Sequence, residues 1–180
     1  MVSNPTNNDL QPSQGSKYVI LYRRLDKAGT EDAKGMALET DSELSKTRST
    51  ERLNTKAGSY VTPSVVEVSG SASSFFAQGD TAIRELEDSI YSPIPTEFWF
   101  IDQNIQNEDG KFEAEYFQGF VTDFTKTGAT EGALSASLSY ELSAPLEPAR
   151  GWATLTREQA AVVNYVFRDT IAGSAPEVTE

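Results

Sequence analysis

The feature that most constrains the fold is a strict alternation of apolar and polar residues in the last third of the chain. Apolar side chains occupy positions 134, 136, 138, 140 and 142, and serine or glutamate occupies positions 135, 137, 139, 141 and 143. Because successive side chains of a strand point to opposite faces, a period of two predicts a half-buried β-strand. One face is expected in the core, and the other faces water or another subunit.

Other β-branched and aromatic runs predict further strands. The Asp109-Gly110 pair lies between the last two of these runs and supplies the positive φ angles of a turn, so a long hairpin is expected there. The predicted strands cover residues 18–24, 36–40 (a weaker strand), 64–73, 97–101 and 112–124.

One helix is predicted in the middle of the chain. Asp80 is a suitable N-cap, and Pro93 and Pro95 end the segment. The apolar stripe on this helix is formed by Ile83, Leu86 and Ile90.

The C-terminal part is expected to leave the sheet. Pro145 and Pro148 mark a break, and residues 156–159 (TREQ) match a capping box. The helix that would follow carries an apolar stripe of Ala160, Val163 and Phe167.

Length and polarity suggest one domain with extensions. Residues 1–16 are rich in Asn, Pro, Ser and Gln, so they predict a flexible arm; residues 17–172 form the domain, with a C-terminal segment at 150–172, and residues 173–180 are a frayed tail. Neither a membrane-spanning apolar run nor a secretory signal is recognisable, which predicts a soluble product without a membrane partner.

The segment at 41–62 is long, polar and of mixed charge. Its basic residues suggest a nucleic-acid patch, salt bridges to an oppositely charged partner surface, or a solvated loop. A strand is predicted on its C-terminal side, so we expect a projecting hairpin with a charged loop at its tip. These basic residues are Lys46, Arg48, Arg52 and Lys56.

The composition argues against catalysis. Cysteine and histidine are both absent, which removes thiolate chemistry and the commonest general base and metal ligand. The paired carboxylates Glu113 and Glu115, or Asp41 and Glu43, fit a glycosidase only weakly, because charges at alternate positions usually form the solvated face of a strand. No phosphate-binding glycine motif is present, so neither enzyme activity nor a cofactor is expected.

The order of these segments and six short strings resemble the major tail tube protein family of long-tailed, non-contractile phages of Gram-positive bacteria. The resemblance runs from about Tyr18 to Thr170. The strings are YVILYR at 18–23, SELSK at 42–46, DGK at 109–111, YFQGFV at 116–121, GWATLT at 151–156 and VFRDT at 166–170.

This resemblance implies a mainly β fold, either a β-sandwich or a flattened barrel, with one flanking α-helix, a long projecting hairpin loop and a helical or extended C-terminal arm. It also implies hexameric rings that stack into a tube in the virion tail, assembled in the host cytoplasm. The tube would meet other tail proteins at its ends and conduct DNA transiently, without specific binding.

By the same resemblance, the 41–62 segment contacts the adjacent ring. The net charge of −12 then acquires a role, because carboxylates that line a lumen repel DNA phosphates. The expected inter-ring contacts are Leu44, Lys46, Arg48, Arg52 and Lys56, and the expected acidic lumen residues are Glu113 and Glu115.

Two alternatives stay open. A tube subunit of a contractile injection or secretion system would share the fold and the hexameric arrangement. A monomeric β-sandwich module that binds carbohydrate would instead present exposed aromatic residues in a groove.

Overall fold

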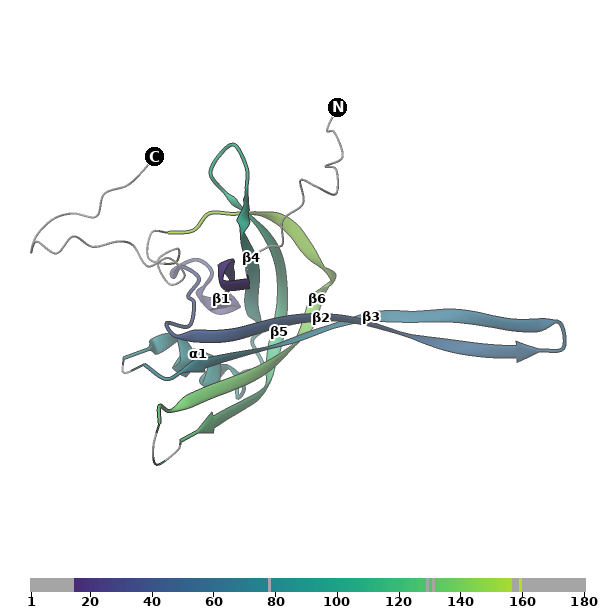
Figure 1. The fold of residues 1–180 in the computed structure, drawn as a ribbon, viewed down its shortest axis with the longest axis horizontal. Coiled ribbons are helices and arrows are strands. Elements are labelled where there is room, and N and C mark those ends of the chain that lie inside the picture. Colours follow the sequence, from purple (N-terminus) through teal and green to yellow (C-terminus); the bar gives the residue numbers. More distant parts are fainter. Residues whose placement is uncertain (1–14, 78, 129, 131, 157–158, 160–180) are drawn as a thin grey trace, which may run out of the picture.

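The computed structural model describes residues 15–77, 79–128, 130, 132–156 and 159. In these residues the chain forms one antiparallel sheet with the strand order β1-β4-β5-β6-β3-β2, together with helix α1 (Figure 1). The strands are β1 (Tyr18–Arg24), β2 (Glu39–Thr55), β3 (Gly58–Phe75), β4 (Thr96–Gln106), β5 (Phe112–Thr127) and β6 (Ser135–Ala153). Helix α1 covers Thr81–Ser89, and short 3₁₀ helices lie at Gly15–Lys17 and Leu25–Lys27.

The sheet folds over on itself because β5 and β6 are long enough to serve two layers. β4 pairs with β5 only as far as Gly119, while β3 pairs with β6 only over residues 135–141. Register shifts interrupt the β5–β6 ladder between these two zones, where strands can bend. One layer therefore contains β1, β4, the first half of β5 and the last residues of β6, which pair with that half of β5. The other layer contains the second half of β5, the first half of β6, β3 and β2.

The main core lies between the two layers. Tyr140 of β6 stacks on Phe98 of β4 with ring centroids 4.7 Å apart, and Phe98 stacks on Phe117 of β5 at 5.2 Å. All three side chains are essentially inaccessible to solvent. This confirms the predicted β-sandwich or flattened barrel.

Helix α1 flanks the main core, as its sequence predicts. The Asp80 carboxylate accepts hydrogen bonds from the backbone N–H groups of Ala82 and Ile83, so it is the N-cap. Ile83 and Leu86 are buried in the core, and Ile90 packs against it.

Strands β1, β4, β5 and β6 confirm the predicted strands in position, but two boundaries differ. The weak strand expected at 36–40 begins only at Glu39, because Met36 fills the core from a loop. The break expected at Pro145 and Pro148 is absent: β6 continues to Ala153, and the two prolines lie where β6 has extra residues between its partners Gln118 and Tyr116. A bulge tolerates proline because its residues leave the hydrogen-bonded ladder.

The 41–62 segment is not a loop. It forms the outer parts of β2 and β3, which pair along nearly their whole length and turn at Lys56-Ala57. The resulting hairpin projects far beyond the body of the molecule, as expected (Figure 1). Pro63 fits into β3 because it lies at a register shift, opposite Thr50.

Two predicted extensions fall largely outside the described residues: the arm at 1–16, apart from Gly15 and Ser16, and the tail at 173–180. The C-terminal segment at 150–172 begins inside β6. Its capping box is formed, because the Thr156 N–H donates to Gln159 Oε1 at 2.7 Å and the Gln159 N–H donates to Thr156 Oγ1 at 3.2 Å. The helical stripe of Ala160, Val163 and Phe167 lies outside the described residues.

Candidate functional site

The outer face of the β5–β6–β3–β2 layer is polar and acidic. Opposite the buried side chains Leu138, Tyr140 and Ala72, the alternate residues point outward. Backbone pairing aligns them in rows across four strands, such as Asp123, Ser139, Ser71 and Glu43. We call this surface the acidic serine face: Asp41, Glu43, Ser69, Ser71, Ser73, Asp123, Thr125, Ser137, Ser139 and Glu141.

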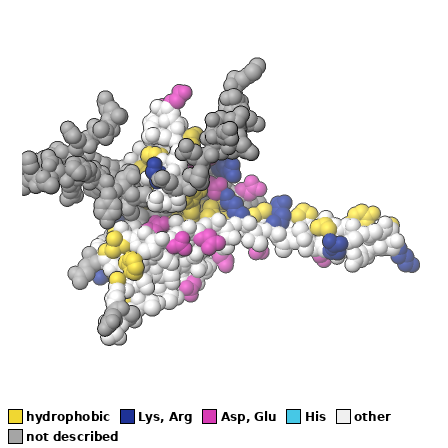
Figure 2. Space-filling view, in the orientation of Figure 1, with side chains coloured by type: hydrophobic (Ala, Val, Ile, Leu, Met, Phe, Trp, Pro, Cys, Tyr) yellow, Lys and Arg dark blue, Asp and Glu magenta, His cyan; other side chains and the backbone are white. Residues whose placement is uncertain are grey.

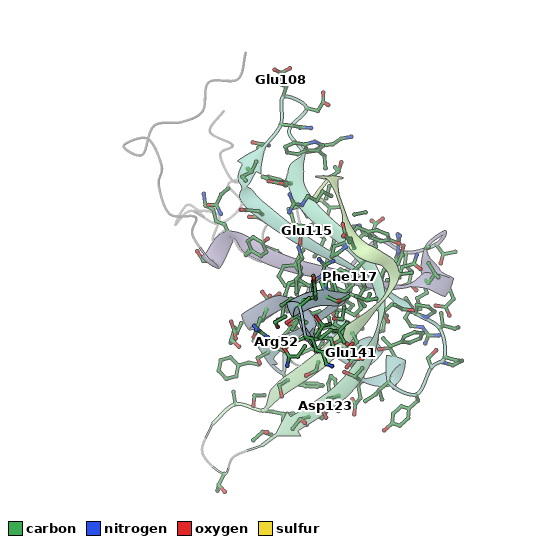
Figure 3. The ribbon with its side chains drawn as sticks, turned by 90° about the vertical axis from the view of Figure 1, so that its right-hand side faces the viewer. Arg52, Glu108, Glu115, Phe117, Asp123 and Glu141 are labelled. Carbon is green, nitrogen blue, oxygen red and sulfur yellow. The ribbon has the colours of Figure 1, made fainter. Side chains whose placement is uncertain are left out.

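The acidic serine face carries one sign of charge. It holds four carboxylates, and none of its described residues is Lys or Arg. Figure 3 labels two of the carboxylates, Asp123 on β5 and Glu141 on β6. A surface of carboxylates and hydroxyl groups repels phosphate while staying wetted.

Two free strand edges border this face. Residues 120–127 of β5 extend beyond the end of β4 pairing, so among the described residues they pair only with β6. At the other side of the same layer, β2 pairs only with β3 within the described chain. Free edges expose backbone donors and acceptors, and natural proteins usually cover them.

The structure separates the residues that the sequence assigned to an inter-ring contact. Leu44 packs against the core of its own chain, and Lys46 Nζ donates to both carboxylate oxygens of Glu115, at 2.8 and 2.6 Å. Arg48 and Arg52 are exposed on the hairpin, where the Arg52 guanidinium donates to Ser59 Oγ at 3.3 Å. Lys56 lies in the exposed turn at the tip.

Glu115, expected in a lumen, is partly buried and ion-paired within its own chain. Its side chain is only 16% exposed and also accepts from Arg150 Nε at 3.3 Å, so three strands are joined at this carboxylate. Glu113 lies two residues from Glu115 on the same face of β5 and pairs in register with Asp102 and Trp152. Burial, and then the nearby Glu115, Asp102 and Glu113 carboxylates, raise the pKa of Tyr18.

The lumen assignment of Glu113 and Glu115 stays a prediction, but the acidic serine face is the stronger candidate, because its carboxylates make no ion pair within the described chain. The sequence did contain a signal for it. Glu141 belongs to the polar half of the alternating pattern, and Asp41 and Glu43 form one of the two carboxylate pairs noted there.

A second polar group lies at the base of the hairpin, where β2 begins. Tyr140 Oη donates to the Glu43 carbonyl at 2.7 Å. Glu39 points into the interior, and burial raises the pKa of its carboxyl to about 7, although Ser42 and the Ile20 backbone donate hydrogen bonds to it. Tyr22 Oη is buried nearby without a hydrogen-bond partner among the described residues.

The described residues hold no group of three or more His, Cys, Asp or Glu residues that could bind a metal ion. A hollow beside Trp99 and Arg23 is lined by a mixture of apolar and polar side chains. None of the described helices is long and apolar enough to cross a membrane.

A sandwich with two free edges on one layer, an acidic face between them and a projecting ribbon defines a structural subunit that builds larger assemblies. Comparison with known proteins identifies the family of such subunits to which the chain belongs. The phage tail tube protein family matches residues 13–147, and the chain belongs to this family. It is therefore a structural protein of the phage virion.

One relative is similar in sequence, and two solved structures share the fold. A protein assigned to the tail of Staphylococcus phage phiMR25 is 32% identical over 166 residues, which is 87% of this chain and 82% of that protein. The SPP1 tail tube structure superposes with a TM-score of 0.67 at 19% identity, covering 91% of this chain and 95% of that one. The tail of a gene transfer agent particle, refined with C6 symmetry, gives a TM-score of 0.57 at 17% identity, over 79% of this chain and all of that one.

Proposed function

We propose that six copies of this chain form a ring, that the rings stack into the tail tube, and that DNA passes through the tube to the host. The observation that carries this proposal is the acidic serine face, which lies between two free strand edges of one layer. Ring closure needs a head-to-tail contact between two different surfaces of the subunit.

The free edges supply such a contact. If β2 of one copy pairs with the free part of β5 in the next, the layer continues from copy to copy and both edges are covered. The sixfold number is supported by the C6 symmetry of the gene transfer agent tail, whose subunit shares the fold.

In such a ring the acidic serine face lines the channel. Affinity for DNA comes largely from Lys and Arg contacts to phosphate, and this face offers none among its described residues. Asp41, Glu43, Asp123 and Glu141 would keep the duplex from adhering while it moves. DNA is then a transient occupant of the channel and is not specifically bound.

The remaining parts of the proposal follow from the same role. The tube assembles in the host cytoplasm, meets other tail proteins at its two ends, and has neither enzyme activity nor a cofactor. A non-contractile tail is preferred to a contractile device because the SPP1 tail tube superposes with a TM-score of 0.67, against 0.57 for the sheath-tube complex of an extracellular contractile injection system.

Electron microscopy of the purified chain tests this function. We expect tubes built from rings with sixfold symmetry. A chain that stays monomeric at every concentration would contradict the proposal and favour the alternative of a monomeric binding module.

The DNA part has a separate test. Tubes assembled in the presence of short duplex DNA and then pelleted should retain little of it. A Ser137→Lys/Ser139→Lys variant should retain DNA in a salt-dependent manner, because it places lysine on the channel wall. Equal retention by the unmodified tubes would show that the channel wall adheres to DNA.

A further inference from the structure

The charged residues of the projecting hairpin are sorted by face. Backbone pairing places Lys46 opposite Val68, Arg48 opposite Val66 and Arg52 opposite Val61, all on one face. The other face pairs Thr47 with Glu67 and Glu51 with Thr62, and begins at Glu43. The six charged residues of the described strand segments 43–55 and 58–71 therefore divide into three cations on one face and three carboxylates on the other.

The register shift near the middle of the hairpin preserves this division. Between the Arg48–Val66 and Thr50–Pro63 pairs, β3 contains one more residue than β2. The extra residue is accommodated as a bulge, so Val66 and Pro63 stay on the cationic face although they are three positions apart. Without the bulge, the outer half of β3 would present the opposite side chains.

The cationic face has the character of a contact surface. Arg48 makes no ion pair with any described residue, and Arg52 contacts only a serine hydroxyl. Val61, on this face, is 52% exposed. Exposed apolar side chains do not distinguish the two faces, because the Leu53–Tyr60 pair of the other face is 51% and 59% exposed, so the unpaired cations mark the cationic face. Figure 2 shows basic and hydrophobic side chains following one another along the hairpin. A two-stranded ribbon this far from the body has marginal stability alone in water, so a partner that covers it is expected.

The carboxylate face has a different neighbour. Glu43 belongs both to this face and to the acidic serine face, because it lies in the row with Ser71, Ser139 and Asp123. Glu67 and Glu51 extend the same line of outward carboxylates along the hairpin. The carboxylate face is therefore a continuation of the surface that we assign to the channel wall.

The resemblance already implies that the 41–62 segment contacts the adjacent ring. We propose that the hairpin makes this contact with a second copy of the chain through its cationic face alone, while its carboxylate face continues the acidic channel wall across the junction between rings. This inference rests on the proposed function. A second copy fits the cationic face because the whole chain carries a net charge of −12, and the unpaired cations of the hairpin are exposed. Attraction between opposite charges would also orient the ribbon, because docking through the carboxylate face would place carboxylates against an acidic partner.

Single cysteines test which face is covered. The chain has no cysteine, so labelling is confined to the introduced one. Val61→Cys and Thr62→Cys are a matched pair, because these exposed neighbours on β3 point to opposite faces. Both variants should react with N-ethylmaleimide at similar rates before assembly. In tubes, Val61→Cys should react at least about tenfold more slowly than before assembly, while the rate for Thr62→Cys should change by less than about threefold.

Equal reactivity of the two cysteines in tubes, or protection of Thr62→Cys instead, would overturn the inference and leave the proposed tube intact. Failure of the wild-type chain to assemble would overturn both. Charge reversal provides the second measurement: Arg48→Glu/Arg52→Glu should abolish tubes without changing the Tm of the subunit, whereas Glu51→Lys/Glu67→Lys should still form them. Normal tubes from the first variant would also contradict docking through the cationic face.

Discussion

Gly70 marks the closest approach of backbone and side chain at the base of the hairpin. A Cβ added there would lie 2.2 Å from the Glu43 carbonyl oxygen and 2.6 Å from the Tyr140 ring. Both neighbours are fixed, since the Tyr140 hydroxyl donates to that same carbonyl and its ring is buried between the layers. Glycine is required here for space.

Gly70→Ala should therefore lower the free energy of unfolding by roughly 1–3 kcal/mol, the usual cost of overpacking. Denaturant unfolding of the unassembled subunit measures the change. Gly151→Ala is the control, because no atom lies within 4 Å of its added Cβ. Equal effects of the two substitutions would mean that the strands near Gly70 can separate at little cost.

Glu39 should make the stability of the subunit depend on pH. Its pKa is about 7 in the folded protein against 4.5 for an ordinary glutamate, so the folded state binds more protons than the unfolded state between these values. Stability is therefore lost as the pH rises from 4.5 through 7, by roughly 2–3 kcal/mol between about pH 5 and pH 8.

Glu39→Gln removes this titration and keeps the shape of the side chain. Denaturant unfolding at several pH values should show the variant gaining stability relative to wild type as the pH rises. Parallel curves for the two proteins would show that the carboxyl group is not desolvated in the folded state.

The surroundings of single residues are the part of the site that the sequence indicates least. The resemblance implies a lumen position for Glu113 and Glu115, which stays a prediction, and the alternate spacing of the two carboxylates favours a solvated strand face. That inference could not foresee that Lys46 and Arg150, distant in sequence, converge on Glu115. Ion pairs between distant strands depend on the bend of the sheet, which no local pattern encodes.

Among the elements, β6 is the one whose sequence predicts its environment most fully. Leu138 is 3% exposed, while the neighbouring Ser137 is exposed on the acidic serine face. The alternation alone placed these two side chains on opposite faces, and the structure confirms it.

Leu138→Asp should destabilise the subunit by roughly 4 kcal/mol or more, because it buries an unpaired charge. Ser137→Asp should cost no more than about 1 kcal/mol, since it adds one carboxylate to a solvated acidic face. Thermal unfolding of the two variants compares them directly. Similar losses of stability would mean that β6 is buried on both faces.

The hairpin shows why an element can be missed. Its strands have no core to pack on, so neither face needs an apolar period, and the 41–62 segment reads as a polar loop. The sorting of charge by face appears only when the strands are paired and the bulge between Ser49 and the Ser64-Val65 pair is taken into account. The sequence predicts a break at the two prolines of β6 for a related reason. Whether a proline ends a strand or lies in a bulge depends on the pairing with the neighbouring strand, which the local sequence does not show.

At the scale of the whole molecule, the acidity of the chain is organised. The carboxylates near Lys27, Lys34 and Lys126 are balanced by ion pairs, while those of the acidic serine face make no ion pair within the described chain. The overall class of fold was implied by the family resemblance, and strand periodicity and one capped helix are compatible with it. The layer that bears the free edges could not be predicted from the sequence. It depends on which half of β5 pairs with β4 and which half of β6 pairs with β3.

The central claim is that the acidic serine face lines the channel of a tube built from this chain. A cryo-electron microscopy reconstruction of tubes assembled from the purified protein, at a resolution that traces the strands, measures this directly. We predict that Asp41, Glu43, Asp123 and Glu141 face the lumen and that β2 of each copy pairs with β5 of the next. A reconstruction in which these four carboxylates face the outside of the tube, or in which another layer surrounds the lumen, would contradict the account.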